Sequence, residues 1–513
     1  MANCGSSRWS RGVPCSLALW QLAAALLASG TAVRGARQPH VVFIVADDVG
    51  WNDVPWHNAG LFSPNLARLA SEGVILEQYY AQPICTPTRA AILTGRYPYK
   101  LGRQGHVLNP LEPTGLTTSV PLLAEELSRL GYSAHALGKW HLGYCSWSYT
   151  PTARGFDSFS GFYLGSQDHY SHTATIDIHT GGFDYRANAT PDWDARGHYS
   201  SKLLADDTIK LLADHAGQER PLFLYLAFQA VHAPLQVPPE YKVPCTKYHN
   251  KNRQLLCGML NALDEAVGRI EKALMHHGYW NNTLLVFTSD NGGQILEGGN
   301  NWPLRGNKNT LWEGGTRVPA FVAGPLLKKT GYTNRKVVHA VDWFPTLLSL
   351  AGEKGGPENL DGVNQWEVLS EDATQVRQEF VYNIRKRAHL EGAIRRPGRE
   401  ARPVAVAARA RGAARKAAAD ARAPPGARGQ PQQRSARRPS AVGRCVHARM
   451  VRAARPTPVT SVEKRQLFFT SSPDRYRRKI RQQRMTIKTQ AQSTMSSAVL
   501  AAQRFCSNRL PYA

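Results

Sequence analysis

Residues 40–48 read HVVFIVADD, a continuous β-branched and apolar run that ends in two aspartates, Asp47 and Asp48. Such a run is typical of a strand that is buried on both faces of a sheet. Helix signals separate it from three further runs with strand character, so the sequence predicts an α/β fold with a mostly parallel sheet. These runs are Tyr132–Leu137, Leu222–Ala230 and Leu284–Ser289, and the helix candidates cover residues 63–73, 119–131, 256–275 and 342–350.

Ionisable or metal-binding side chains follow each of the four predicted strands. The carboxyl ends of parallel strands lie along one edge of a sheet, where open α/β folds place their sites. Each group alone has an ordinary explanation, such as a helix cap, a solvated carboxylate or a structural histidine. Their coincidence predicts a functional site. In strand order the groups are Asp47 and Asp48, Lys139 and His141, His232, and Asp290 with Asn291.

A candidate nucleophile lies in the segment QPICTPTRAAILTGRY, residues 82–97. Thr86 is expected to cap a helix whose first residue is Pro87, which would place Cys85 at a helix N-terminus. Backbone N–H groups at such an end favour anionic ligands, and Arg89, about one turn further on, is within reach of the same pocket. The alternative is a structural cysteine that precedes a proline-initiated helix.

The pattern Cys85-x-Pro-x-Arg89, followed by LTGR, resembles the signature of the sulfatase family. Within that family the chain resembles the group of arylsulfatases B, I and J, which includes N-acetylgalactosamine-4-sulfatase, over residues 38–384. The resemblance implies an alkaline-phosphatase-like fold, a large mostly parallel mixed sheet flanked by helices, with a small C-terminal α+β domain. The other matching segments are ADDVGWND (46–53), GKWHLG (138–143), the stretch before His232, SDNGG (289–293) and GGNNWPLRGNKNTLWEGG (298–315).

The same resemblance implies a modified nucleophile and a calcium site. Cys85 falls on the position that the formylglycine-generating enzyme converts to formylglycine, and the hydrate of that aldehyde attacks the sulfur. Carboxylate and amide oxygens suit a hard divalent cation such as Ca2+. The residues that fall on the metal ligands are Cys85, Asp47, Asp48, Asp290 and Asn291.

Cations and proton carriers complete the site that the resemblance implies. Sulfate ester cleavage builds charge on oxygen atoms, and cations placed there in advance lower the barrier. Asp290 is implied as the base for the attack, and His141 as the acceptor of a second proton. The residues implied to position the nucleophile are Arg89, Lys139 and His141, and those implied to bind the substrate are Lys139, His232 and Lys308.

The sequence therefore predicts a sulfuric ester hydrolase of the arylsulfatase type. A sulfated glycosaminoglycan such as N-acetylgalactosamine 4-sulfate is the expected substrate, and another sulfated glycan or a small aryl sulfate stays open. Loops rich in aromatic residues, at 165–172 and 299–304, are candidates for stacking on sugar rings, and their aromatic side chains are equally compatible with packing. One alternative is a phosphatase or phosphodiesterase of the same superfold, which usually uses two zinc ions and a Ser or Thr nucleophile. Another is a catalytically inactive protein that binds sulfated glycans.

Charge divides the 513-residue chain into two parts. Residues 1–384 hold 32 Lys+Arg and 33 Asp+Glu, a net charge of −1, whereas residues 385–513 hold 31 and 5, a net charge of +26. The first part gives no reason to expect nucleic-acid binding. The Arg/Ala/Pro-rich tail is predicted to be disordered. It is interpreted as a polyanion-binding arm, an inert tail, or an out-of-frame or mis-spliced end in place of the small domain.

The first 36 residues have the pattern of a secretory signal peptide, with an apolar run at 17–28 that is too short to span a bilayer. No later run predicts a membrane span. We therefore expect a catalytic domain over residues 37–384 that enters the secretory pathway and reaches the lysosome or the extracellular space. Sequons predict glycosylation at Asn188 and Asn281, and Cys245 with Cys257 is the disulfide candidate.

Overall fold

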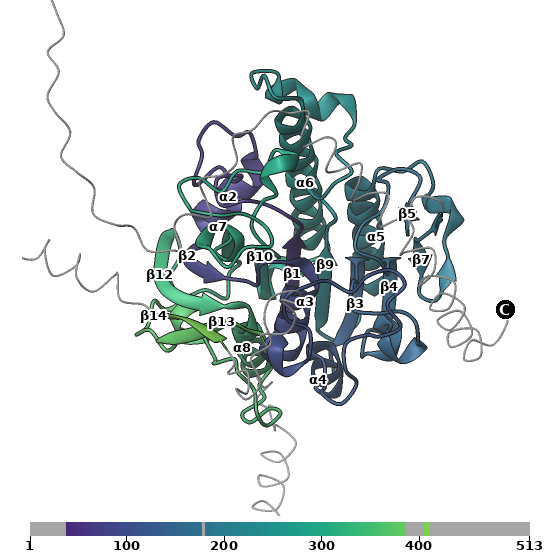
Figure 1. Cartoon of the computed structure of the whole chain (residues 1–513). Coiled ribbons are helices and arrows are strands. Elements are labelled where there is room, and N and C mark those ends of the chain that lie inside the picture. Colours follow the sequence, from purple (N-terminus) through teal and green to yellow (C-terminus); the bar gives the residue numbers. More distant parts are fainter. Residues whose placement is uncertain (1–36, 177–179, 386–403, 410–513) are drawn as a thin grey trace, which may run out of the picture.

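The computed structural model describes residues 37–176, 180–385 and 404–409. A ten-stranded sheet forms its centre, and helices cover both faces (Figure 1). The strand order is β12-β2-β11-β10-β1-β9-β3-β4-β7-β8. Neighbours from β10 to β4 are parallel, whereas β11 runs antiparallel to both of its neighbours. The predicted α/β fold with a mostly parallel mixed sheet is confirmed.

The strands of this sheet are β1 (His40–Ala46), β2 (Val74–Tyr80), β3 (Ser133–Lys139), β4 (Ser158–Phe162), β7 (Arg186–Ala187), β8 (Thr190–Pro191), β9 (Leu222–Ala227), β10 (Thr283–Ser289), β11 (Ala320–Ala323) and β12 (Tyr332–His339). Two small sheets pair β5 (Thr173–Thr175) with β6 (Gly181–Phe183), and β13 (Glu379–Arg385) with β14 (Val404–Arg409). The helices are α2 (Pro64–Glu72), α3 (Cys85–Thr94), α4 (Leu123–Arg129), α5 (Ser200–His215), α6 (Lys251–His276), α7 (Glu313–Thr316), α8 (Trp343–Leu350) and α9 (Trp366–Ser370).

Strand β1 is buried along its whole length because its side chains alternate between two hydrophobic cores. Val41, Phe43 and Val45 pack on the side of α3, α4 and α8. Val42 and Ile44 face the opposite core, which α2, α5 and α6 cover. This two-sided burial explains why the strand reads as an unbroken apolar run, as predicted.

The four predicted strands and the four predicted helices are present, and all of them except the first strand have shifted ends. Strand β1 has the predicted bounds, and β3 extends two residues further, to Lys139. The helix expected to open at Ser119 begins instead at Leu123. The reason is the side chain of Glu125, which accepts the N–H of Leu122 at 2.5 Å and thereby starts the helix later.

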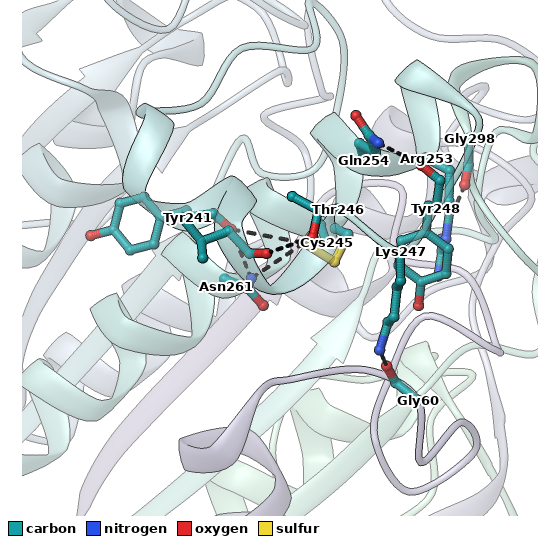
Figure 2. The surroundings of a disulfide bond; sticks show 12 residues. Gly60, Tyr241, Cys245, Thr246, Lys247, Tyr248, Arg253, Gln254, Asn261 and Gly298 are labelled. Carbon is teal, nitrogen blue, oxygen red and sulfur yellow. Dashed lines mark hydrogen bonds between the residues drawn. A yellow bond between two sulfur atoms is a disulfide. The ribbon is translucent and has the colours of Figure 1, made fainter.

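A disulfide joins Cys245 to Cys257, so that the end of a short 3-10 segment is tied to helix α6 (Figure 2). Asn261, one turn further along α6, donates from Nδ2 to the carbonyl of Tyr241 at 2.9 Å. Arg253, also on α6, donates to the carbonyl of Gly298 at 3.0 Å. Helix α6 thereby holds two loops that border the strand ends.

Part of the chain organisation predicted above lies outside the described residues. This applies to the signal peptide and to most of the basic tail, of which only Arg385 and strand β14 are described. Strand β14 pairs antiparallel with β13, which carries the last residues of the predicted catalytic domain. Among the helices that the structure describes, none is both long and apolar enough to cross a bilayer. The domain boundaries stay a prediction.

The stability of the folded chain is expected to fall as the pH drops from about 6.5 to about 4, in part because of His40. This buried ring accepts the N–H of Leu222 at Nδ1, 3.0 Å away, and burial followed by the charge of Arg37 lowers its pKa to about 4. The unfolded chain binds a proton near the ordinary pKa of 6.5, so acid favours unfolding. We expect His40 to account for about 1–2 kcal/mol between pH 7 and pH 5.

Urea unfolding of the wild type and of His40→Asn at both pH values measures this effect. Asparagine keeps an acceptor near the same place but does not titrate, so the variant should lose less stability on acidification. His276→Asn, at an exposed position on α6, is the matched control and should behave like the wild type. An equal acid loss in the wild type and in His40→Asn would contradict the prediction.

Candidate active site

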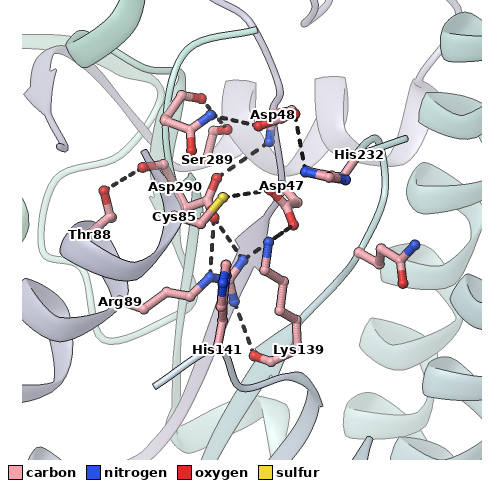
Figure 3. Close-up of polar contacts among 12 residues, drawn as sticks. Asp47, Asp48, Cys85, Thr88, Arg89, Lys139, His141, His232, Ser289 and Asp290 are labelled. Atoms are coloured by element: carbon pink, nitrogen blue, oxygen red, sulfur yellow. Dashed lines mark hydrogen bonds and ion pairs between the residues drawn. The ribbon is translucent and has the colours of Figure 1, made fainter. Parts of the chain in front are cut away.

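The carboxyl ends of four neighbouring strands meet at one place on the sheet (Figure 3). Strands β10, β1, β9 and β3 stand side by side in this order, so residues far apart in the sequence come together. The N-terminus of α3 and the loop before α7 approach the same place. The site residues delivered there are Asp47, Asp48, Cys85, Arg89, Lys139, His141, His232, Asp290, Asn291 and Lys308.

The two aspartates after β1 point to different partners because Asp48 has a left-handed backbone, with φ 63°. Asp47 accepts a hydrogen bond from Lys139 Nζ at 2.5 Å. Asp48 accepts one from Lys308 Nζ at 2.8 Å and one from Asn291 Nδ2 at 2.7 Å. Burial raises the pKa of both carboxyls, but the charges of the neighbouring lysines, of His232 and, for Asp47, of Arg89 together outweigh it, and the net pKa of each is lowered. Both carboxylates are therefore ionised at neutral pH.

Arg89 is fully buried and links the strand ends through its guanidinium. Nε and Nη2 donate to the same oxygen of Asp290, Oδ2, at 3.1 and 2.8 Å, and Nη1 donates to the carbonyl of Lys139 at 3.1 Å. Nη2 also lies 3.7 Å from Asp47 Oδ2. The planar guanidinium of Arg89 thus orients Asp290, Lys139 and Asp47.

Helix α3 begins at Cys85, with Ile84 as its N-cap, so the expected cap at Thr86 and start at Pro87 are wrong by two residues. The hydroxyl of Thr86 turns away from the helix end. It donates to the carbonyl of His141 at 3.1 Å and accepts the N–H of Leu108 at 3.1 Å. The prediction that Cys85 stands at a helix N-terminus is confirmed.

The thiol of Cys85 is held among ionised groups. The residue is 2% exposed, and its Sγ lies 3.6 Å from Asp47 Oδ1. Burial and the carboxylate of Asp290 raise the pKa of the thiol to about 12, against the opposing charges of Lys139 and Lys308. An unmodified thiol at this position is protonated at neutral pH and is a weak nucleophile.

One ring nitrogen of His141 is left open. Nε2 lies 3.0 Å from the carbonyl oxygen of Leu108, so it carries the proton and donates. Nδ1 is buried and has no hydrogen-bond partner among the described residues. Burial, together with Lys139 and Arg89, holds the pKa of the ring well below its usual value. His141 is therefore neutral, with a free lone pair on Nδ1.

A cavity of about 230 Å³ opens over Cys85, and His141, His232 and Lys308 line it. Lys308 is 8% exposed, although it lies in a Gly/Asn-rich loop where an exposed lysine would be the usual case. Burial disfavours its ammonium, but the ionised carboxylates of Asp48 and Asp47 raise its pKa. The ring of His232 points Nε2 toward Asp48 Oδ2, 3.9 Å away. The cavity is thus polar and cationic on one side.

The residues present fit a hard divalent cation. Asn291 Oδ1 is buried and accepts no hydrogen bond from the described residues, although Nδ2 of the same side chain is bonded to Asp48. An open oxygen beside ionised carboxylates is a donor set that such a cation satisfies. Asp290 adjoins the same place, with Oδ1 3.4 Å from the backbone nitrogen of Asp48. The described side chains whose potential ligand atoms lie within 4.8 Å of one another are Asp47, Asp48, Cys85 and His232.

Several residues that shape the site were not predicted. The segment 107–110 and Thr175 line the cavity, and the carbonyl of Leu108 fixes the ring of His141. The hydroxyl of Thr88 donates to the carbonyl of Asp290 at 2.5 Å. Backbone atoms and loop positions of this kind carry no motif in the sequence. Gly165 and Ser166, at the start of one loop proposed for sugar contact, do line the cavity.

Known proteins resemble this chain over the region that contains the sheet and the candidate site. The family model described as Sulfatase matches residues 39–353. Arylsulfatase J from Mus musculus is 44% identical over 358 residues, which are 69% of this chain and 59% of that protein. N-acetylgalactosamine-6-sulfatase from Sus scrofa is 30% identical, and the match covers 71% of this chain and 72% of that protein. Arylsulfatase A from Homo sapiens is 32% identical, and the match covers 72% of this chain and 74% of that protein.

Solved structures share the fold. The crystal structure of Ps i-CgsB in complex with k-i-k-neocarrahexaose is 33% identical, with a TM-score of 0.61 over 64% of this chain and 76% of that one. The PsFucS1 sulfatase from Pseudoalteromonas sp. is 25% identical, with a TM-score of 0.57 over 72% of this chain and 79% of that one. The chain spans about 59% of the length of Arylsulfatase J.

Proposed function

This chain belongs to the sulfatase family, and from that premise we propose that it is a sulfuric ester hydrolase of the arylsulfatase type. The observation that carries the proposal is the single cavity that Cys85, His141, His232 and Lys308 line above a buried carboxylate cluster. Hydrolysis of a sulfate ester builds negative charge on the oxygens around sulfur. Fixed cations in a buried site stabilise that charge without having to reorganise.

We propose that residue 85 acts as formylglycine, which the formylglycine-generating enzyme makes from Cys85. When present, this aldehyde supplies through its hydrate a hydroxyl nucleophile and a route by which sulfate leaves and the aldehyde returns. Arg89 and Lys139 fix the carboxylates around residue 85 and so hold this position in one geometry. His141, neutral and open at Nδ1, accepts a proton within the cavity.

Lys308 and His232 serve the substrate in this proposal. Both line the cavity on the side of Asp48, and Lys308 remains protonated there because its pKa is raised. The ammonium of Lys308 binds a sulfate oxygen, and the ring of His232 gives a proton to the departing alcohol. Lys139 adds a second buried positive charge near the sulfate group.

Asp47, Asp48, Asp290 and Asn291 would hold a calcium ion. A bound calcium ion would polarise the sulfate oxygens and favour the ionised form of the nucleophile. The support is the oxygen-rich donor set and the open Oδ1 of Asn291. The two-zinc alternative of a phosphatase is less favoured, because the single histidine with ligand atoms in this cluster is His232, among the residues that the structure describes.

Calcium is expected to raise the thermal stability of the protein. Binding to the folded state alone adds about 2.7 kcal/mol at a concentration of 100 Kd. The midpoint of thermal unfolding, measured after chelation and again after readdition of calcium, checks this without an activity assay. Asp48→Asn should abolish the calcium-dependent rise. Asp264→Asn, which changes a buried carboxylate that accepts backbone N–H groups of α2, should keep it.

An unchanged midpoint with calcium would contradict the calcium proposal. Metal analysis would then decide between an empty site and two bound zinc ions.

The substrate class that we propose is a sulfated glycosaminoglycan, with N-acetylgalactosamine 4-sulfate as the representative sugar. The names of the relatives support it, since they include an N-acetylgalactosamine-6-sulfatase and arylsulfatases.

We further propose that the chain follows the secretory route to the lysosome or the cell exterior. Both sequon asparagines, Asn188 and Asn281, are exposed and accessible to glycosylation. Polyanion binding by the basic tail remains a proposal.

Turnover assays test the proposed function. The protein should hydrolyse 4-nitrocatechol sulfate and a 4-sulfated oligosaccharide, and should leave the matching phosphate monoester nearly untouched. Phosphate monoester turnover without sulfatase turnover, together with two zinc ions, would replace the proposal with the phosphatase alternative. Binding of sulfated glycan with no turnover by material that carries formylglycine would favour the inactive glycan-binding protein.

A further inference from the structure

A stack of two aromatic rings and one guanidinium, of which one ring and the guanidinium are exposed, lies beside the cavity. Phe183, at the end of β6, and Trp193 stack with ring centroids 4.3 Å apart and planes inclined by 19°. The guanidinium carbon of Arg196 lies 5.9 Å from the Phe183 ring and 5.7 Å from the Trp193 ring. We call these three residues the aromatic platform. Trp193 is 58% exposed, so most of the indole is open to solvent.

The register of the β5–β6 hairpin places the platform next to the cavity. Thr175 lines the cavity, and it pairs with Gly181 across the hairpin, whereas Phe183 pairs with Thr173. Residues 173 and 175 of a strand point to the same face, and so does a residue directly opposite either of them. Diagonal neighbours of this kind are about 7–8 Å apart. The platform therefore begins about one sugar ring beyond the cavity wall.

Neither the packing nor the local charges account for this arrangement. A large aromatic ring that is mostly exposed contributes little to a core and is typical of a binding surface. Among the described residues, no carboxylate lies within ion-pair distance of Arg196, although Asp194 is in the adjacent turn. The guanidinium is exposed and lies at the outer limit of cation–π distance from both rings, so its hydrogen-bond donors are open to solvent or to a ligand.

We infer that the aromatic platform is a second sugar subsite, which binds the anionic residue next to the sulfated sugar in the cavity. The inference rests on the proposed function and specifies it further. The two rings offer a flat apolar surface to the apolar face of a pyranose. Arg196 pairs with a carboxylate or sulfate on that same sugar, as its planar fork suits both. The preferred substrate is accordingly an acidic oligosaccharide and not a small aryl sulfate.

Substitutions on the platform separate the two substrate classes. Steady-state kinetics would be measured with 4-nitrocatechol sulfate, which occupies the cavity alone, and with a tetrasaccharide of alternating uronate and 4-sulfated N-acetylgalactosamine. Trp193→Ala and Arg196→Ala should each raise KM for the tetrasaccharide by about tenfold. Both variants should keep kcat, and all constants for the aryl sulfate, within about twofold of the wild type. Trp147→Ala, at another exposed tryptophan, is the control and should change neither substrate.

The outcomes distinguish the subsite from the proposed function. Unchanged tetrasaccharide KM in both variants, with normal aryl sulfate turnover, would overturn the subsite and leave the function standing. If the wild type hydrolyses neither substrate, the function fails. The subsite is then judged by calorimetric binding of the tetrasaccharide: a Kd weakened about tenfold by Trp193→Ala supports it, and an equal Kd overturns it. Equal unfolding temperatures exclude a folding defect.

Discussion

Cys85→Ala is expected to lower kcat/KM for sulfate esters by about 10³-fold or more, because it removes the side chain that we propose accepts the sulfuryl group. Cys85 lies in the cavity, and the cations around it stabilise charge but offer no replacement nucleophile. The fold should survive, since only one sulfur atom is lost from a position next to an open cavity. The measurement is turnover of 4-nitrocatechol sulfate by variant and wild type purified from the same secretory host, with thermal unfolding as the check on structure.

Cys85→Ser is the matched control because it keeps nearly the same size and adds a hydroxyl. A serine ester of sulfate has no second hydroxyl on the same carbon, so it cannot return to an aldehyde and release sulfate. Turnover should stay low, and a serine that attacks once should carry a mass increase of about 80 Da. In the wild type, mass spectrometry of the peptide should show a loss of about 18 Da relative to the thiol. Full-speed turnover by a protein with an intact thiol would contradict the nucleophile proposed here.

The central strands were predictable because a strand that is buried on both faces appears in the sequence as an unbroken apolar run. Strand β1 supplies alternate residues to two cores, so the whole run is apolar and its bounds can be read from the sequence. Strands β11 and β12 lack this signal. Strand β11 has only four residues, AFVA, and β12 contains the polar stretch TNRK within YTNRKVVH. Their place in the sheet depends on tertiary pairing with β2, which local sequence does not encode.

The position of the site at the carboxyl ends of the strands was predictable from the sequence, whereas the individual side-chain contacts in it were not. Placing ionisable residues after parallel strands is enough to bring Asp47 near Asp290, since β1 and β10 are adjacent. The burial of Lys308 depends instead on a folded loop. The side chain of Asn301 binds backbone atoms of Gly293 and Gly306 at 2.8–3.4 Å and so closes the loop over the site. A Gly/Asn-rich sequence is compatible with many loop shapes, and only the long-range contacts select this one.

Apart from changes at the proposed nucleophile, Arg89→Met is expected to be the most damaging substitution, because it affects both stability and turnover. The guanidinium is the partner of Asp290 and lies near Asp47, and both carboxylates are fully buried. Removing one partner of a buried ion pair costs about 3–5 kcal/mol, since the other charge is left without compensation. We expect the midpoint of urea unfolding to fall accordingly, and kcat to fall by at least about 10²-fold in the folded fraction.

Arg377→Met is the control that separates these two effects. Arg377 is also buried and donates from Nε to both oxygens of Asp342, at 3.0 and 2.8 Å, but neither residue lines the cavity. The control should lose similar stability and keep nearly normal kcat at a temperature where it is folded. Arg89→Lys should recover part of the stability but little kcat, because an ammonium cannot reproduce the fork that orients Asp290 and the Lys139 carbonyl. Equal kcat values in the two methionine variants would show that Arg89 only supports the fold and does not position the reacting groups.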